Sequence, residues 1–508
     1  MFHPSPHRVG PRFNALISVA TLGLGALLPS TAPPPLAVQT DPHLQGSIPK
    51  APSYVLGFPR WFPQTVDYRP RQGAVVAADI DGDGRKDLVV SVPSGEVLVV
   101  HPDGTLFAGW PRRFDDLTQP AFPMGEPAVG DLNGDGVPDI VICIVSGSPT
   151  RRNYLYAMQA DGSDLDGWPI ELPGGGNDLF TCSNIPTLLA DLDGDGKLEV
   201  IRGMNKGIIL GFDRFGKALT GPAWPVRLVP DIPGLTREIN ADLVAADVDG
   251  DGKKDLVFVE SGLAPRLAAV SSDGRLLKGF PMQLQEIVDR ESPVVADVDG
   301  DGRPEVVQAT MPFDGVIIEP QPEPSAGPAV PANLHALRAD GSDARGWPRR
   351  LQSGASWGAV LTDLDGDGQP EILQQDGTEL VGFNLDGNPL PGYPVVIHRD
   401  FVRSQSVDVS PWAVGLLNGD RRPDLLQVWS SQYNGTSCLR VFGLRAAGNP
   451  IRGFPFDATG MVAASRPVLT DVSGDGVDDL VMLVAKDANG GWLLTAWDLG
   501  TLLTGPTP

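Results

Sequence analysis

The chain has 508 residues, 41% of them hydrophobic, and a formal net charge of −24 at pH 7. This length exceeds one ordinary globular core and predicts several domains or an array of repeats, while the hydrophobic content excludes a disordered polymer. The acidic balance disfavours nucleic acid and anionic lipid surfaces as partners and favours cations.

The first 32 residues have the pattern of a signal peptide. Arg8 and Arg12 precede an apolar run from Ala15 to Leu28, and small residues follow it. The run is short for a membrane-spanning helix, and no other segment is long and apolar enough. We therefore expect a secreted or cell-surface protein with no stable membrane span after cleavage; an uncleaved anchor is the alternative. Residues 33–53 are interpreted as a proline-rich linker.

An acidic nonapeptide of the form DxDGDGxxD/E then recurs eight times, at intervals of 50 to 66 residues. A fixed period of this length is typical of a repeat architecture. The eight loops begin at Asp79, Asp131, Asp191, Asp247, Asp297, Asp363, Leu416 and Asp471.

A second motif, glycine or alanine followed by an aromatic residue and proline, accompanies each acidic loop. Between the motifs, short apolar runs are broken by turn residues, without a sustained helical period. About four strands per unit result, and four-stranded sheets repeated radially form a β-propeller. We expect the motif aromatics to pack between blades; stacking on sugars is the alternative. The aromatics are Phe58, Trp110, Trp168, Trp224, Phe280, Trp347, Tyr393 and Phe454.

The sequence thus predicts an all-β fold, an eight-bladed β-propeller of four-stranded blades spanning residues 54–508. The phase of the repeat predicts how the ring closes, because an unpaired Gly-Phe-Pro segment opens it and the last unit lacks one. Residues 54–63 should add the outermost strand to the blade formed by residues 466–498 and so cover its edge. Residues 311–331 are rich in proline and are expected to form a protruding insertion.

The acidic loops have the chemistry of a hard-cation site. Side chains at positions 1, 3 and 5 converge when the loop curls, glycine at position 6 permits the turn, and a carbonyl at position 7 with an acid at position 9 completes an all-oxygen cage. Such a cage favours Ca²⁺ over zinc or copper. The candidate ligand residues are Asp79, Asp81, Asp83, Arg85 and Asp87; Asp131, Asn133, Asp135, Val137 and Asp139; Asp191, Asp193, Asp195, Lys197 and Glu199; Asp247, Asp249, Asp251, Lys253 and Asp255; Asp297, Asp299, Asp301, Arg303 and Glu305; Asp363, Asp365, Asp367, Gln369 and Glu371; and Asp471, Ser473, Asp475, Val477 and Asp479.

The seventh loop departs from this pattern. Leu416 replaces the first ligand, and Arg421 replaces the glycine at position 6. We predict no metal there, and about seven Ca²⁺ ions in all. Asn133 and Ser473 still offer neutral oxygens at position 3, so their loops should bind. Cys143, Cys182 and Cys438 are too few and odd in number for a disulfide framework and are expected to pack as small apolar residues. One pair, such as Cys143 with Cys182, could oxidise instead, and the sequence does not decide it.

The paired loop and Gly-aromatic-Pro unit resembles the FG-GAP/VCBS repeats of the integrin α-chain N-terminal propeller and its bacterial relatives. The resemblance covers nearly the whole chain after the linker. It implies that the acidic loop joins two strands within a blade and binds calcium. The integrin propeller has seven blades, so seven blades plus a divergent unit is the alternative to eight.

For function, we expect a non-catalytic extracellular interaction or adhesion scaffold for a protein or polysaccharide. The rival class is a calcium-dependent polysaccharide lyase or other carbohydrate-active enzyme, which the resemblance also includes. Catalysis needs a base and a charge stabiliser in one pocket. The histidines after the signal region are scattered, and no nucleophile elbow or HExxH motif is present, so we predict no catalytic residue. These histidines are His43, His101, His335 and His398.

Overall fold

The computed structural model divides the chain into residues 1–47 and a compact unit of residues 48–508, and only the second unit is described. The expected signal peptide, most of the linker and the insertion at 311–331 lie outside the described residues. No helix in the described part of the chain is both long and apolar enough to cross a membrane. The described residues are 51–62, 73–114, 121–146, 151–176, 182–183, 185–228, 238–261, 265–283, 292–310, 332–353, 357–397, 407–433, 436–486 and 491–504.

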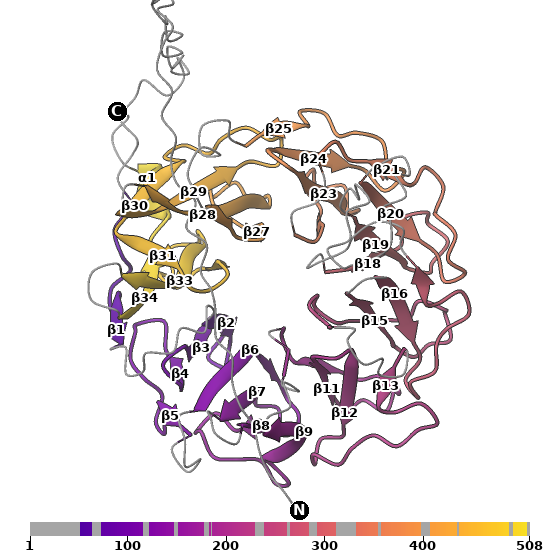
Figure 1. The fold of residues 1–508 in the computed structure, drawn as a ribbon. Coiled ribbons are helices and arrows are strands. Elements are labelled where there is room, and N and C mark those ends of the chain that lie inside the picture. Colours follow the sequence, from indigo (N-terminus) through magenta and orange to yellow (C-terminus); the bar gives the residue numbers. More distant parts are fainter. Residues whose placement is uncertain are drawn as a thin grey trace, which may run out of the picture. The chain divides into compact units, whose positions relative to one another are not determined.

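Eight antiparallel sheets follow one another around a ring, which confirms the predicted eight-bladed β-propeller (Figure 1). In each blade the chain passes from the innermost strand outward. The first four blades are β2 (Ala74–Ala78), β3 (Asp87–Val92), β4 (Glu96–Val100) and β5 (Arg112–Arg113); β6 (Ala121–Gly130), β7 (Asp139–Ser146), β8 (Arg151–Met158) and β9 (Ile170–Gly176); β10 (Leu188–Ala190), β11 (Glu199–Met204), β12 (Ile208–Phe212) and β13 (Val226–Arg227); and β14 (Val244–Ala246), β15 (Asp255–Glu260), β16 (Arg266–Val270) and β17 (Met282–Gln283).

The last two blades differ from the prediction of four strands, because their innermost strand is divided into two segments that pair with the same neighbour. Pro411 and Pro467, which cannot donate a ladder hydrogen bond, lie in the gaps between the segments. Blades 5 to 8 are β18 (Val294–Ala296), β19 (Glu305–Ala309), β20 (Asn333–Leu337) and β21 (Arg349–Arg350); β22 (Val360–Thr362), β23 (Glu371–Asp376), β24 (Glu379–Phe383) and β25 (Val395–Val396); β26 (Val407–Val409), β27 (Ala413–Gly415), β28 (Asp424–Tyr433), β29 (Thr436–Leu444) and β30 (Phe456–Thr459); and β31 (Met461–Ala463), β32 (Val468–Thr470), β33 (Asp479–Lys486) and β34 (Trp492–Trp497), followed by α1 (Gly500–Thr504).

The two ends of the described unit meet in blade 8, as the repeat phase predicts. Strand β1 (Arg60–Phe62) pairs antiparallel with β34, with Arg60 opposite Leu494 and Phe62 opposite Trp492. Tyr54 forms a further bridge with Trp497. In Figure 1 the indigo β1 lies beside the yellow β34. This pairing closes the ring and covers an edge that would otherwise expose unpaired backbone groups.

The hydrophobic core lies between blades. The second strands β3, β7 and β15 are largely apolar and buried along their whole length, because both faces of such a strand pack against neighbouring sheets. The buried residues form eight clusters, one for each pair of adjacent blades, including the pair of blades 8 and 1. The core is therefore continuous around the ring.

The Gly-aromatic-Pro motif joins each blade to the next. The indole N–H of Trp110 in blade 1 donates to the carbonyl oxygen of Ala160 in blade 2 at 2.7 Å, and Trp168, Trp224 and Trp347 make the same contact with the following blades. A Cβ on Gly109 would lie 1.9 Å from the carbonyl oxygen of Asp161, so only glycine fits there. Trp110, Trp168 and Trp347 are at most 8% exposed, which confirms packing between blades.

A disulfide bond joins Cys143 in β7 to Cys182, which lies beside blade 3 and bridges to Met204. The sequence left this pairing open. Cys438 is a free, partly buried thiol. Blades 2 and 3 are thus linked covalently as well as by their shared apolar cluster.

Candidate metal centres

Each acidic loop joins the innermost strand of a blade to the second strand. In the first loop, the two carboxylate oxygens of Asp79 accept hydrogen bonds from the backbone N–H groups of Gly82, at 2.7 Å, and Gly84, at 3.0 Å. Gly84 has a φ of 88°, a conformation that glycine adopts without strain. The same two bonds recur at Asp131, Asp191, Asp297, Asp363 and Asp471. The position 1 carboxylate therefore lies inside the curl of the loop.

The side chains at positions 3 and 5 each accept a hydrogen bond from the backbone N–H two residues later. One oxygen of Asp81 accepts the N–H of Asp83 at 3.1 Å, and one oxygen of Asp83 accepts the N–H of Arg85 at 2.7 Å. Asp79, Asp81 and Asp83 thereby bring ligand atoms within 4.8 Å of one another. The third, fourth and fifth loops also bring three acidic side chains this close. Several acidic clusters could therefore hold a metal ion.

Position 9 supplies a buried acid at the start of the second strand. One oxygen of this acid accepts the N–H of position 2, as Asp87 does from Ile80 at 2.9 Å, in every loop except the eighth, where Asp479 accepts the N–H of Ser473 at 2.7 Å. These eight acids are at most 8% exposed. This acid therefore lies at the base of each loop, and metal binding by the predicted ligands of positions 1, 3, 5 and 9 stays a prediction.

Burial dominates the electrostatics of position 9, because water no longer stabilises the charged form. It raises the pKa of Asp139 and Asp255 to about 6 and the pKa of Glu199 and Asp479 to about 7. Nearby loop carboxylates raise these pKa values further by like-charge repulsion. A bound cation would reverse both effects, because it replaces lost hydration and attracts the charge.

Two buried carboxylate oxygens without a hydrogen-bond partner bear on whether these residues fit a cation. Oδ1 of Asp247, at position 1 of the fourth loop, and Oδ1 of Asp479, at position 9 of the eighth, are buried and have no hydrogen-bond partner. A buried polar atom without a partner is costly, and in native proteins it commonly indicates a missing water or ion. Together with the all-oxygen donor set, these atoms fit a hard divalent cation.

The seventh loop keeps its shape without the position 1 carboxylate. Asp424 accepts the N–H of Leu417 at 3.0 Å, and Asp420 accepts the N–H of Arg422 at 2.9 Å, as their counterparts do elsewhere. The backbone N–H of Leu416 instead donates to the carboxylate of Asp478 in blade 8 at 2.7 Å, and its carbonyl oxygen accepts the N–H of Asp478 at 2.9 Å. The absence of metal at this loop stays a prediction.

In two loops, a basic side chain from the third strand or the turn after it contacts a ligand carboxylate, which the sequence analysis missed. Arg338 donates to Oδ2 of Asp299 in the fifth loop at 2.9 and 2.5 Å, and Nδ1 of His101 lies 3.4 Å from Oδ1 of Asp87 in the first. Both residues occupy the same place in the repeat, three residues before the glycine of the turn that follows the third strand. An alignment of the eight units would have indicated them.

A charged cluster at the ring axis was also missed. Arg466 of blade 8 forms ion pairs with Glu126 of blade 2, at 3.3 Å, and with Asp242 of blade 4, at 2.9 Å. Each residue lies five positions before its acidic loop. Because blades 4 and 8 are opposite in an eight-bladed ring, these contacts span the central opening. An alignment of the eight units would have indicated this cluster, because the equivalent residues of the other five units are uncharged: Ala74, Pro186, Ser292, Gly358 and Pro411.

Residues 79–142, 131–201 and 247–307 match a family model described as FG-GAP-like repeat. No curated protein matches the chain. Among solved structures, the chain is similar to the V. cholerae biofilm matrix protein Bap1, with 14% identity over 88% of this chain and 91% of that chain and a TM-score of 0.35.

Two further solved structures are similar to the chain at comparably low sequence identity. The Dos1 propeller has 10% identity over 89% of this chain and 96% of its own, with a TM-score of 0.41. The quinohemoprotein alcohol dehydrogenase ADHIIG from Pseudomonas putida HK5 has 12% identity over 86% and 77%, with a TM-score of 0.42. These likenesses are too distant to indicate a function.

Proposed function

We propose that this chain, an FG-GAP repeat β-propeller, is an exported calcium-binding scaffold that presents its blade loops to an extracellular protein or polysaccharide. The observation that carries the proposal is the convergence of three acidic side chains in the first, third, fourth and fifth loops, together with buried oxygens of Asp247 and Asp479 that lack a partner. The side chains of positions 1, 3, 5 and 9, with the carbonyl of position 7, would hold each ion. Bound calcium would compensate the negative charge of these carboxylates.

Calcium suits these loops better than other common cations. Zinc and copper favour nitrogen and sulfur ligands, and magnesium requires a rigid octahedron with several waters. Seven ions of charge +2 would reduce the formal net charge from −24 to −10. At free calcium about ten times the Kd, each independent site would contribute about 1.4 kcal/mol, and seven sites roughly 10 kcal/mol. This equals the net stability of a typical domain, so we assign calcium chiefly a folding function.

Two independent features support export. The N-terminal 32 residues have signal-peptide composition, and Cys143 is bonded to Cys182. Structural disulfides form and persist mainly in oxidising compartments. An exported protein would also meet millimolar calcium outside many cells, where sites of modest affinity are filled.

The enzymatic alternative would need a free base and a free charge stabiliser in one pocket. Arg466 is the cation of the charged cluster, but two carboxylates already pair with its guanidinium group. We therefore propose a non-catalytic function. Release of unsaturated products from an acidic polysaccharide by the purified chain would contradict it.

Metal analysis combined with calorimetry tests the proposal. The full chain is dialysed against calcium, its bound ions are counted by mass spectrometry, and its melting temperature is measured with and without a chelator. We expect about seven Ca²⁺ ions per chain and a melting temperature that falls by more than 10 °C on chelation. Far fewer ions, or identical melting in both conditions, would refute it.

A further inference from the structure

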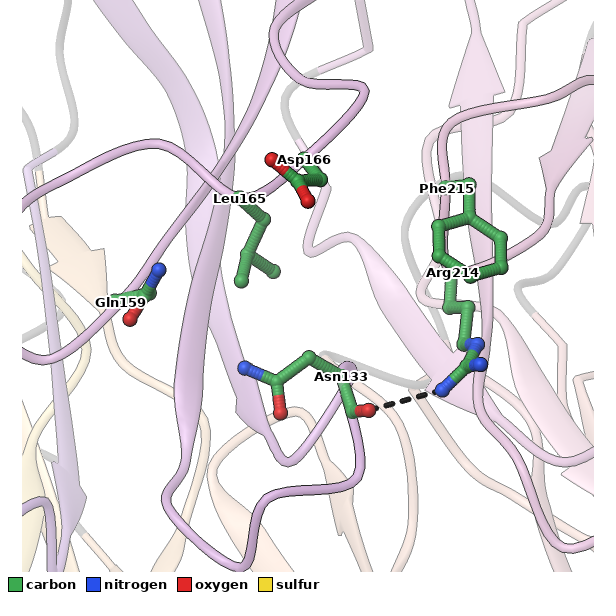
Figure 2. A pocket seen from close by; sticks show the side chains of 6 residues that line it. All are labelled: Asn133, Gln159, Leu165, Asp166, Arg214 and Phe215. Atoms are coloured by element: carbon green, nitrogen blue, oxygen red, sulfur yellow. Dashed lines mark hydrogen bonds between the residues drawn. The ribbon is translucent and has the colours of Figure 1, made fainter.

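A pocket lies between blades 2 and 3, beside the second acidic loop. Its volume is about 220 Å³, and six residues line it: Asn133, Gln159, Leu165, Asp166, Arg214 and Phe215. Figure 2 shows Gln159, Leu165 and Asp166 on one side, Arg214 and Phe215 on the other, and Asn133 between them. A pocket of this size, below the roughly 300–1,000 Å³ typical of ligand sites, suits one small ring rather than a large cofactor.

The cation of this pocket is held in place. Nη1 of Arg214 donates to the backbone carbonyl oxygen of Asn133 at 2.9 Å, drawn as the dashed line in Figure 2. The guanidinium carbon lies 4.5 Å from the centre of the Phe215 ring, a cation–π contact. Among the described residues the other N–H groups of Arg214 form no hydrogen bond, so they can donate to a ligand, and these two contacts restrain the guanidinium group.

The other polar groups of the pocket are not committed to the protein. Within the described residues, no side-chain hydrogen bond is recorded for the Gln159 amide or for the Asp166 carboxylate. Phe215 is 56% exposed although it is a large apolar residue. The pocket therefore combines guanidinium and amide donors, amide and carboxylate acceptors, and an exposed aromatic ring.

The repeat itself indicates that this pocket is specialised. Five blades have an aspartate where blade 3 has Phe215: Asp103, Asp161, Asp273, Asp340 and Asp386. Where this aspartate caps the turn, its oxygen accepts a backbone N–H two residues later, as in Asp161 with Ser163 at 2.9 Å. In blade 3, Asp213 takes over the cap by accepting the N–H groups of Phe215 and Lys217, each at 2.9 Å. An aromatic ring thus replaces the usual carboxylate while the turn is retained.

We propose that this pocket binds one sugar ring of a neutral glycan. Each hydroxyl group of a sugar both donates and accepts, which matches the mixture of Arg214, Gln159 and Asp166, and the apolar face of a sugar ring packs on an aromatic ring such as Phe215. A strongly anionic ligand is disfavoured by Asp166 and the adjacent acidic loop, and a cationic ligand by Arg214. This inference deepens the proposed function by naming a partner class.

Saturation-transfer NMR with the full chain in saturating calcium tests the pocket. The probes are the methyl glycosides of glucose, galactose, mannose and N-acetylglucosamine, with methyl glucuronoside, inorganic phosphate and Nα-acetyl-lysine amide for the competing chemistries. Phe215→Ala and Asp166→Ala remove the ring and the carboxylate. Leu276→Ala is the matched control, because Leu276 is 42% exposed in the corresponding hairpin of blade 4.

We expect transfer to at least one neutral glycoside, a Kd at least fivefold higher in both pocket variants, and an unchanged Kd in Leu276→Ala. Absence of transfer to every neutral glycoside would overturn the proposal, as would binding that Phe215→Ala and Asp166→Ala leave intact. Binding restricted to glucuronoside, phosphate or the lysine amide would overturn the ligand class. The calcium count is measured on the same samples, so failure of the pocket is distinguishable from failure of the metal sites.

Discussion

The sixth acidic loop, residues 363–371, and the seventh, residues 416–424, occupy equivalent places in adjacent blades, yet only the sixth has a carboxylate at position 1. Both loops bury the position 9 acid and hydrogen-bond it to the N–H of position 2, at 2.6 Å in the sixth and 3.0 Å in the seventh. The backbone curl therefore does not depend on the complete ligand set. What distinguishes the two loops is whether a cation can compensate the buried charge.

The largest expected effect concerns this compensation and appears as pH dependence. Burial raises the pKa of Asp424 to about 7, against about 3.9 when unfolded. Such an acid contributes stability below about pH 4 that is lost as the pH rises through 7. In saturating calcium, we expect Asp424→Asn to gain stability relative to the parent, on the order of 3 kcal/mol between pH 4 and 8. Chemical denaturation across this range measures it.

The sixth loop provides the matched control for this pH experiment. Burial also raises the pKa of Glu371, but bound calcium should hold this residue charged. In calcium, Glu371→Gln should therefore lose stability relative to the parent as the pH rises, which is the opposite sign. In a chelator both variants should behave alike. If both variants gained, or both lost, stability relative to the parent as the pH rises in calcium, the proposed difference between the loops would be refuted.

Next in size is conversion of the sixth loop into the seventh. Asp363→Leu should bind one calcium ion fewer than the parent. At free calcium about ten times the Kd, it should be less stable than the parent by about 1.4 kcal/mol, and in a chelator the two proteins should be equally stable. Leu416→Ala serves as the control, since it changes the same position in a loop expected to lack metal. A metal count that does not change in Asp363→Leu would show that position 1 is dispensable.

The reverse conversion should have a smaller effect. Leu416→Asp combined with Arg421→Gly restores the consensus and relieves the positive φ of Arg421, which is 66°. We expect one additional calcium ion but less than 1.4 kcal/mol of stabilisation, because Asp478 already contacts Leu416 and adds a repelling carboxylate. An unchanged metal count in titration calorimetry would contradict this.

The smallest effect distinguishes among the intact loops. Because Arg338 competes with a cation for Asp299, Arg338→Ala should raise the calcium affinity of the fifth loop by about two- to fivefold, the value of a partly exposed ion pair. Competition against a calcium indicator measures the affinity. Arg445→Ala, at the same place in the seventh unit, is the control and should leave the titration unaltered.

The periodic features of the fold could be predicted from the sequence. Eight acidic loops and eight Gly-aromatic-Pro motifs determined the number of blades, and their phase predicted the pairing of β1 with β34. These features repeat in the chain, so each copy supports the others. The candidate loop ligands were predicted for the same reason, and metal binding by them stays a prediction.

Features that join different blades could not be predicted in this way. The ion pairs of Arg466 connect residues more than 200 positions apart, and the pocket combines a loop of blade 2 with a hairpin of blade 3. Such contacts depend on how the ring brings unequal units together. The division of the innermost strand in blades 7 and 8 likewise depends on local prolines that the motif alone does not include.

The bond between Cys143 and Cys182 has a consequence for recognition. It fixes blade 2 to blade 3, and these two blades supply the opposite walls of the pocket in Figure 2. A ligand that enters would find its contacts already at their final separation, so less conformational entropy is lost on association. Preorganisation of this kind increases affinity without any additional contact.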